Sequence, residues 1–472
     1  MRRRSKGAGW AVTEGHAFDP TILREYDVRG VVGDTLHAAD AFALGRAFGT
    51  VVAEGGGTRV AVGRDGRLSS PEIAAATVEG LTAAGIDALD IGGCPTPGLY
   101  FAVHHLGADG GIMITGSHNP PDYNGFKLML GTAPFFGADI QRLGEIAAAG
   151  RFASGAGGVE RVSILEPYVA RLLRDHRQER ALSVIWDCGN GATGPVVTAL
   201  AAALPGTHQV LYPEVDGTFP NHHPDPTVPE TLDGLRTAVA EAKADLGIAF
   251  DGDGDRIGVI DETGRVIWGD QLVAIYATEV LAAQPGATVI ADVKASRMLF
   301  DRIDELGGVP LMWRTGHSLI KTKMAETGAP LAGEMSGHLF FRDRYYGFDD
   351  ALYAALRLLA LVAGSDRPVS AWRDDLPETV NTPEIRFPCA EERKFAAVET
   401  VKAALAARSD VSVNDIDGVR VTSEDGWWLL RASNTQNVLV ARCEAQSAEA
   451  LERLKDQVRN AVRGAGLDVP DF

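Results

Sequence analysis

Short apolar runs alternate with alanine-rich stretches along most of the chain, and this alternation is the feature that most limits its fold. In the first block, apolar runs over residues 58–62 and 86–91 enclose a helical pattern over residues 71–81. Such an order is typical of βα units, in which strands form a largely parallel sheet and helices pack against it. Further blocks of this kind cover residues 183–250 and 287–331, so we expect an α/β protein.

Beyond about residue 373 the pattern changes. A helical stretch over residues 390–407 precedes several apolar runs, and a Glu-Asp-Gly turn at residues 424–426 separates two of them. The final stretch repeats apolar residues at helical spacing from Leu451 to Val462. These elements predict an α+β domain with an antiparallel sheet.

The composition is that of a globular protein with several domains. The chain has 472 residues, of which 45% are hydrophobic, and this length exceeds what one compact core can hold. Its formal charge of −18 argues against a nucleic-acid partner, because phosphate backbones need a dense basic face. No stretch is long and apolar enough to span a bilayer, and the four cysteines form no CxxC pair. We expect a cytoplasmic protein, a monomer or weak oligomer, without a membrane partner.

Three of the predicted apolar strands end in loops rich in polar side chains. Ser117 follows the strand at residues 111–114, three aspartates follow residues 246–250, and Glu334 and Ser336 follow a strand of the third block. Open α/β sheets bind ligands at the carboxyl ends of their strands. Three such loops predict three related domains that face one cleft.

Ser117 is the candidate for covalent chemistry. Residues 115–127 place a serine, a histidine, two asparagines and a lysine beside glycines and prolines that fix the backbone. The nucleophile elbow of a hydrolase needs glycine two residues before and after the serine, where this chain has Thr115 and Asn119, so that interpretation fails. A serine that only caps a helix or closes a turn is the weaker alternative.

Asp251, Asp253 and Asp255 place three carboxylates at alternate positions of a glycine-containing loop. Such a concentration of negative charge needs a cation, and hard oxygen ligands indicate Mg²⁺ or Ca²⁺. An EF-hand is the competing interpretation, since Glu262 stands at position 12. Arg256 opposes it at position 6, where that turn needs glycine, and the flanking sequences are typical of strands. Mg²⁺ held by few protein ligands leaves room for phosphate oxygens, so phosphate is the implied partner.

Two further loops suit a sugar phosphate. The loop with Arg431 combines a guanidinium, hydroxyls, an amide and backbone N–H groups, which suits a phosphate dianion, while a plain turn is the alternative. Glu334 and Ser336 lie beside glycines and present hydrogen-bonding groups that suit sugar hydroxyls. Lys294 and His317 also lie just past predicted strands, where each is as readily structural as functional.

Together the four loops closely resemble those of the α-D-phosphohexomutase superfamily, enzymes that move phosphate between O1 and O6 of hexose phosphates. The loops stand in the family's order, residues 25–30 match its N-terminal motif, and the likeness runs from about Phe18 to the last helix. Residues 333–338 resemble the sugar loop of the bacterial phosphomannomutase/phosphoglucomutase group, whereas phosphoglucosamine mutases typically carry glutamine in place of Met335. Asn437 departs from the proline that many members have after the phosphate loop.

The resemblance implies reversible interconversion of the 1-phosphates and 6-phosphates of mannose and glucose. It implies a phosphoserine at Ser117, a hexose 1,6-bisphosphate as intermediate and primer, and Mg²⁺ as the metal. A phosphoglucosamine mutase is the nearest alternative, and a non-catalytic sugar-phosphate-binding protein is a distant one. The implied residues are, for catalysis, Ser117, Lys127, Arg29, His338 and Arg256; for substrate binding, Tyr26, Lys294, His317, Glu334, Ser336, Arg431, Ser433, Asn434 and Thr435; and for the metal, Asp251, Asp253, Asp255 and Ser117.

The predicted architecture is three related mixed α/β domains plus a C-terminal α+β domain, arranged around a central cleft. His338, Arg29 and Lys127 are candidates for moving the proton of the attacking hydroxyl, and the sequence does not rank them. A hinge near residue 373 would let the last domain swing while the intermediate turns end for end. The predicted parts are a disordered basic arm at 1–14, a phosphoserine-bearing α/β domain at 15–160, a metal-binding α/β domain at 161–262, a sugar-recognition α/β domain at 263–372 and a phosphate-binding α+β domain at 373–472.

Overall fold

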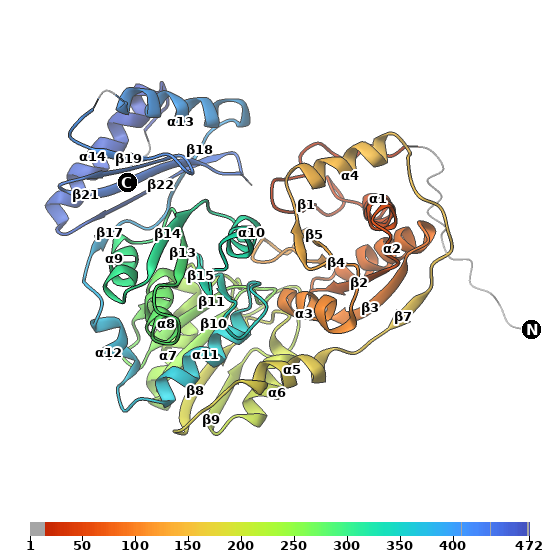
Figure 1. Cartoon of the computed structure of the whole chain (residues 1–472), viewed down its shortest axis with the longest axis horizontal. Coiled ribbons are helices and arrows are strands. Elements are labelled where there is room, and N and C mark those ends of the chain that lie inside the picture. The colour runs from red at the N-terminus through yellow and green to blue at the C-terminus, as the bar shows by residue number, and fades with distance from the viewer. Residues whose placement is uncertain (1–14, 407, 435, 470–471) are drawn as a thin grey trace, which may run out of the picture. The chain divides into compact units, whose positions relative to one another are not determined.

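A computed structural model describes residues 15–406, 408–434, 436–469 and 472 (Figure 1). The chain divides into two compact units. The first reaches to Val266 and includes Phe348–Asp366; the second comprises Ile267–Gly347 and Arg367–Phe472. The predicted basic arm at residues 1–14 lies outside the described residues, and the four predicted domain boundaries stay predictions.

The first sheet is mixed, with parallel strands from its middle to one edge and antiparallel pairing towards the other edge. Its parallel strands are β4 (Gly110–Ile114), β2 (Arg59–Arg64), β3 (Asp87–Gly93) and β7 (Val159–Arg161). Beyond β4 lies β5 (Tyr123–Leu130), which runs antiparallel to β4 and to its other neighbour, β1 (Val28–Val31), while β6 (Ala133–Phe135) pairs with β5.

Helices cover both faces of this sheet because β4 is apolar on both faces (Figure 1). Ile112 and Ile114 join the core formed with α1 (Ala38–Glu54), α2 (Ser70–Ala83) and α4 (Ala138–Ala148). Gly111 points the other way, and a Cβ built on it would lie 2.7 Å from Val103 of α3 (Thr96–Leu106). Helices α1 and α2 pack backbone to backbone, since a Cβ on Gly45 would lie 2.3 Å from the carbonyl oxygen of Thr77.

The second and third sheets repeat this plan. In the second, β9 (Gly206–Leu211), β8 (Leu182–Asp187) and β10 (Leu246–Phe250) are parallel, and β11 (Ile257–Asp261) returns antiparallel to β10, with β12 (Val266–Ile267) beyond it. In the third, β14 (Val309–Trp313), β13 (Thr288–Asp292) and β15 (Leu331–Gly333) are parallel, and β16 (Leu339–Phe341) returns antiparallel to β15.

Helices also pack on these two sheets. On one face of the second sheet, α7 (Asp233–Ala242) shares a core with Ile185 and Ile260, and α10 (His317–Thr327) shares one with Ile290 of the third sheet. The other helices before the last sheet are α5 (Leu165–Arg174), α6 (Gly194–Ala203), the 3₁₀ turn η1 (Pro229–Leu232), α8 (Gly269–Ala283), α9 (Arg297–Glu305), α11 (Ala351–Ala363) and α12 (Val369–Asp374).

The three chemically rich loops occupy the same place in this repeated plan. Each connects a parallel strand to the antiparallel strand that returns beside it: β4 to β5, β10 to β11 and β15 to β16. The predicted relationship among three mixed α/β domains is therefore confirmed at the level of topology. The strands on both sides of the aspartate loop also agree with the rejection of an EF-hand, which needs helices there.

The last sheet is antiparallel, as predicted (Figure 1). Its order is β17 (Val380–Asn381), β22 (Val438–Ala445), β21 (Gly426–Ala432), β20 (Val419–Ser423) and β19 (Ser412–Asn414), with β18 (Ile385–Pro388) also paired to β22. Its two helices, α13 (Glu391–Leu405) and α14 (Ala448–Gly464), share a core with Trp428 and Leu430. The alternate residues Trp427 and Leu429 pack with Val293 of the third sheet's domain.

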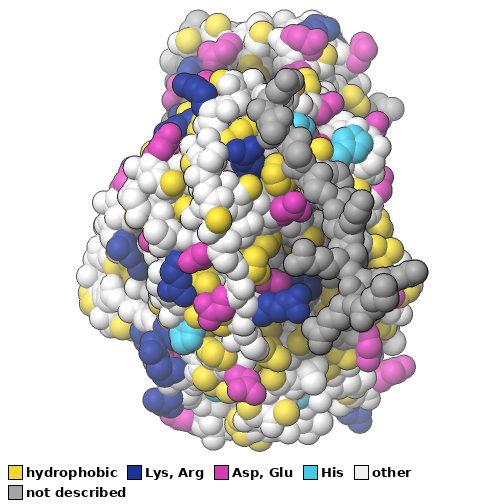
Figure 2. Space-filling model, turned by 90° about the vertical axis from the view of Figure 1, so that its right-hand side faces the viewer, with side chains coloured by type: hydrophobic (Ala, Val, Ile, Leu, Met, Phe, Trp, Pro, Cys, Tyr) yellow, Lys and Arg dark blue, Asp and Glu magenta, His cyan; other side chains and the backbone are white. Residues whose placement is uncertain are grey.

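The surface mixes both signs of charge. On the face drawn in Figure 2, basic, acidic and hydrophobic side chains of the described residues are interspersed. All four cysteines are buried and free. Within the described ranges, no helix combines the length and hydrophobicity that crossing a membrane requires.

Candidate active site

Ser117 lies in the turn that follows β4, and its side chain is directed at the aspartate loop. The residue is buried and has a φ of +49°, in the left-handed region that few non-glycine residues adopt. Its Oγ donates to Asp251 Oδ2 at 2.9 Å and lies 3.1 Å from Nδ1 of His118. Its backbone N–H donates to Thr115 Oγ1 at 2.8 Å. The turn therefore fixes a hydroxyl beside a carboxylate.

The aspartate loop connects β10 to β11, and its three carboxylates are fully buried. Asp251 Oδ1 accepts the backbone N–H groups of Gly254, Asp255 and Arg256 at 2.9–3.2 Å, which fixes the loop around it. Burial raises the pKa of Asp251 well above its ordinary value, and the charges of Asp253 and Asp255 raise it further. Three carboxylates in this space resist full ionisation without a cation.

The donor set fits a hard divalent cation. One oxygen each of Asp251, Asp253 and Asp255 lies within 4.8 Å of the others. Asp253 Oδ1 is buried and has no hydrogen-bond partner among the described residues, while Asp253 Oδ2 accepts from Thr96, Thr115 and Lys127. A carboxylate oriented through one oxygen, with the other buried and unpaired, is suited to ligate a hard metal ion.

Lys127 brings positive charge to the carboxylates from β5. Its register opposite Met113 of β4 places it beside the Ser117 turn. Its Nζ donates to Asp253 Oδ2 at 2.7 Å and also bonds Asp255. Burial alone would lower the pKa of this ammonium, but the surrounding aspartates raise it above its ordinary value. Lys127 is therefore held in its charged form.

The first unit also contains the predicted residues Arg29, Tyr26 and Arg256. Arg29 is buried on β1 and pairs with Asp27, and Tyr26 is buried just before that strand. The backbone of Arg256 closes the aspartate loop. Arg256 and Arg29 also act on His118, whose pKa falls well below its ordinary value through burial and these charges. The imidazole beside Ser117 is therefore neutral at neutral pH.

In the second unit, Glu334, Ser336 and His338 gather on the turn between β15 and β16. Glu334 Oε1 accepts the backbone N–H of Gly316 at 2.6 Å, and Oε2 lies 2.7 Å from Nδ1 of His338. Ser336 Oγ lies 3.2 Å from the same nitrogen. The ring of His317, at the start of α10, stacks on His338 with centroids 5.5 Å apart. Burial alone would raise the pKa of Glu334, but His338 holds it at about 2, so Glu334 is ionised at neutral pH.

Lys294 is anchored at the end of β13. Its Nζ donates to Glu384 at 2.7 Å and lies 3.8 Å from Asp292 Oδ2. Asp292 in turn accepts from the backbone of Met335 and the hydroxyl of Thr315. Burial raises the pKa of Asp292 to about 6, against the opposing effect of Lys294. Asp292 thus ties the Glu334 turn to the turn before α10.

The residues predicted to bind phosphate lie at the end of β21 and in the loop between β21 and β22. Arg431 is buried, and its Nε donates to Asp417 at 3.0 Å, which fixes the plane of the guanidinium. Ser433 is also buried, and its Oγ accepts the backbone N–H of Gln436 at 3.2 Å. Asn434 is described at the same turn, whereas Thr435 lies outside the described residues.

Comparison with protein families decides what these loops belong to. Residues 20–153, 166–264 and 268–380 match the family descriptions "Phosphoglucomutase/phosphomannomutase, alpha/beta/alpha domain" I, II and III, and residues 384–461 match the C-terminal domain. The chain belongs to the phosphoglucomutase/phosphomannomutase family.

Relatives of this family cover nearly the whole chain. A phosphomannomutase/phosphoglucomutase from Pseudomonas aeruginosa is 47% identical over 95% of this chain and 97% of its own length. A phosphoglucomutase from Neisseria gonorrhoeae is 43% identical over 93% and 96%. The crystal structure of a phosphoglucomutase/phosphomannomutase family protein from Burkholderia thailandensis superposes with a TM-score of 0.91 at 45% identity, covering 96% of this chain and all of that one.

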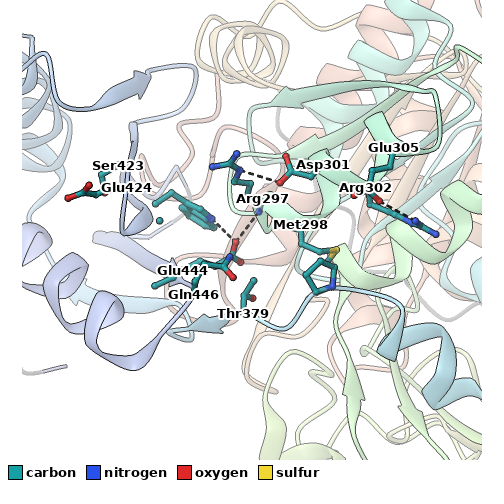
Figure 3. A pocket seen from close by; sticks show the side chains of 14 residues that line it. Arg297, Met298, Asp301, Arg302, Glu305, Thr379, Ser423, Glu424, Glu444 and Gln446 are labelled. Carbon is teal, nitrogen blue, oxygen red and sulfur yellow. Dashed lines mark hydrogen bonds and ion pairs between the residues drawn. The ribbon is translucent and has the colours of Figure 1, made fainter.

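A cavity of about 330 Å³ lies in the second unit of this phosphoglucomutase/phosphomannomutase family member (Figure 3). It is lined by α9 on one side and by strands β21 and β22 on the other, and none of the predicted site residues is among its lining residues. Glu444 joins the two sides, since its Oε1 accepts from Trp427 Nε1 at 2.8 Å and from the backbone N–H of Arg297 at 3.0 Å. Glu444 therefore connects the C-terminal sheet to helix α9 of the preceding domain.

Replacing Glu334 with glutamine should reduce the acid sensitivity of the second unit. Because the folded pKa of about 2 is below the unfolded value of 4.5, the ionised carboxylate contributes stability that is complete above pH 4.5 and is lost as the pH falls towards 2. That contribution is roughly 3 kcal/mol. The thermal midpoint of Glu334→Gln, measured from pH 7 to pH 2, should start lower than that of the wild type and fall less steeply. Glu326→Gln, which removes an exposed partner of Lys323, is the control. Parallel curves for Glu334→Gln and wild type would contradict the assignment.

Proposed function

We propose that this chain is a Mg²⁺-dependent phosphohexomutase that interconverts the 1-phosphates and 6-phosphates of mannose and glucose. The observation that carries the proposal is the buried Ser117 hydroxyl, 2.9 Å from Asp251 at the edge of a cluster of three carboxylates. The relatives named phosphomannomutase/phosphoglucomutase support the same activity, because they match this chain over nearly its full length.

Ser117 would carry the phosphoryl group in the resting enzyme. In the first transfer, the bond between the Ser117 oxygen and phosphorus breaks, and a bond forms between phosphorus and a sugar hydroxyl oxygen. The hydroxyl loses its proton to a base, and the serine oxygen regains one. The product is a hexose 1,6-bisphosphate. The second transfer returns the other phosphoryl group to Ser117, so the net result is an isomerised hexose phosphate.

The residues around Ser117 supply position and charge, which is most of what phosphoryl transfer asks of a protein. Mg²⁺ held by Asp251, Asp253 and Asp255 would neutralise charge on the transferring group. Lys127 adds a fixed ammonium on the same carboxylates, and the turn of Ser117 holds the nucleophile in one conformation. Primer bisphosphate is needed because the unphosphorylated serine cannot begin the cycle.

The residues of the second unit would hold the parts of the substrate that do not react. Ionised Glu334 accepts hydrogen bonds, which suits sugar hydroxyls, and the fixed guanidinium of Arg431 suits a phosphate. Among the proton-transfer candidates, His338 pairs with Glu334 through Nδ1, so it would exchange a proton through Nε2. Arg29 and Lys127 remain the other candidates.

Substrate preference can be measured by turnover of mannose 1-phosphate, glucose 1-phosphate and glucosamine 1-phosphate, each primed with glucose 1,6-bisphosphate. We expect kcat/KM for the first two within about tenfold of each other, since they differ only at the 2-hydroxyl, and a value at least about tenfold lower for the glucosamine phosphate. Met335 supports this order, because its thioether is a poorer partner for an amino group than glutamine would be.

Two outcomes would contradict the proposal in different ways. Best turnover of glucosamine 1-phosphate would make the chain a phosphoglucosamine mutase. Binding of all three sugars without turnover, together with no phosphate on Ser117 after priming, would make it a sugar-phosphate-binding protein. A reaction without primer, on protein first dephosphorylated and checked by mass, is the control for the bisphosphate requirement.

A further inference from the structure

Arg67 lies in the turn between β2 and α2, and its guanidinium is buried under the Ser117 loop. Nη1 donates to the carbonyl oxygens of Pro120 and Tyr123 at 2.5 and 3.0 Å. Nη2 donates to those of Ser117 and Asn119 at 2.8 and 2.6 Å. One side chain thus binds four carbonyl groups of a single loop, although about 50 residues separate it from them in sequence. The remaining nitrogen, Nε, lies 3.2 Å from Asp65 Oδ2.

Asp65 ties the guanidinium to the same loop from its other side. Its Oδ2 accepts the backbone N–H of Gly116, the residue before Ser117, at 3.0 Å. Its Oδ1 accepts the hydroxyl of Ser70 and the N–H of Arg67. The carboxylate therefore neutralises the buried guanidinium and binds the loop's N–H while Arg67 binds its carbonyl groups.

The guanidinium packs closely against the loop at Gly116. A Cβ added to Gly116 would lie 2.3 Å from Arg67 Cζ, so only glycine leaves room for this contact. On another side the ring of Phe219 lies 5.4 Å from Cζ. A lysine could not replace this arrangement, because an ammonium has three donors on one atom, whereas the planar guanidinium has five in a fixed fork.

Ser117 needs such a support because its left-handed backbone is unfavourable for a residue with a Cβ. Its N–H is held by Thr115, its hydroxyl by Asp251, and its carbonyl by Arg67. We propose that Arg67 is a positioning residue that holds Ser117 in the conformation in which its hydroxyl takes up and releases the phosphoryl group. The inference rests on the proposed function. Arg67 itself makes no bond with the transferring group.

Arg67→Lys and Arg67→Met test this inference. Because a displaced nucleophile slows transfer without removing substrate contacts, we expect Arg67→Lys to lower kcat about a hundredfold while KM stays within about threefold. The rate at which glucose 1,6-bisphosphate phosphorylates Ser117, followed by intact mass, should fall by a similar factor. Arg67→Met should show a larger loss in the same direction. Circular dichroism and the thermal midpoint report whether each variant is folded.

A second variant disturbs the same contact without changing Arg67 itself. Gly116→Ala should displace the guanidinium and reproduce the loss of kcat, and combining it with Arg67→Lys should add little, since both disturb one contact. Arg46→Lys is the matched control. Arg46 lies in α1 of the same sheet's domain, 4.4 Å from the ring of Phe152, and its Nη2 donates to Ala153 rather than to the Ser117 loop. Its kcat should equal that of the wild type.

Three results separate the possibilities. Wild-type kcat and phosphorylation rate in Arg67→Lys would overturn the inference. A loss of kcat that merely reflects reduced stability would also overturn it. This would be the case if Arg46→Lys, at an equal decrease in thermal midpoint, lost as much kcat as Arg67→Lys. If the wild type itself neither turns over hexose phosphates nor takes up phosphate, the proposed function fails, and that failure is visible before any variant is compared.

Discussion

Replacing Ser117 with alanine should abolish hexose phosphate interconversion, with kcat lowered by more than about a thousandfold. The hydroxyl oxygen is the atom that would accept and donate the phosphoryl group, and alanine has none. Glucose 1,6-bisphosphate should add the mass of one phosphate to the wild type and nothing to Ser117→Ala. Binding of hexose phosphate to the variant, measured by calorimetry, should persist, because the substrate-binding residues are unchanged.

The loss must be separated from a loss of folding. Ser117 Oγ donates to a fully buried carboxylate, so alanine leaves Asp251 without one donor at a cost of about 1–2 kcal/mol. Thr227→Ala removes a comparable hydroxyl, which donates to Asp225 at 2.7 Å in the same unit, and it should keep full activity. Turnover by Ser117→Ala within about tenfold of the wild type would show that another group carries the phosphoryl, since alanine offers no atom that could carry it.

The strands and their loops were predictable because they depend on local pattern. The apolar run at residues 246–250 predicted a strand, and β10 has those bounds. The expected helix over residues 390–407 is present as Glu391–Leu405, among the described residues. Since parallel strands bring their carboxyl ends to one edge of a sheet, the rule for open α/β sheets placed Ser117, Glu334 and the aspartates on loops of one kind.

The supports of these loops were not predictable, because their partners come together only in the folded chain. Thr96 donates to Asp253 across 157 residues, and beside Pro97 its sequence context indicates only the start of a helix. Arg67 stands in a polar turn, which predicts a solvated side chain rather than a buried one. The sequence singles out Lys294 as a candidate functional residue. It does not single out Asp292, two residues before it, which accepts from Thr315 and Met335 and so connects their two turns. The left-handed conformation of Ser117 has no sequence signal either.

Replacing Asp253 with asparagine should lower the affinity for Mg²⁺ by at least about a hundredfold. The substitution removes one of three negative charges from a buried cluster and replaces a hard anionic donor with a neutral amide. Ligand binding to the folded state raises the thermal midpoint, so the wild type should gain stability as Mg²⁺ is added after treatment with EDTA. Asp253→Asn should need a correspondingly higher Mg²⁺ concentration for the same gain, and kcat should fall with it.

Without metal, Asp253→Asn should change the thermal midpoint little, or raise it. Asp253 raises the pKa of Asp251, so removing its charge relieves repulsion among the carboxylates even as it weakens the pairing with Lys127. Asp225→Asn is the control, because that carboxylate caps a turn at Thr227 in the same unit and lies outside the cluster. If the thermal midpoint of Asp253→Asn responds to Mg²⁺ at the same concentrations as the wild type, the three aspartates do not hold the ion. Their burial together would then have to be explained by Lys127 and Arg256, the two cations that act on Asp251.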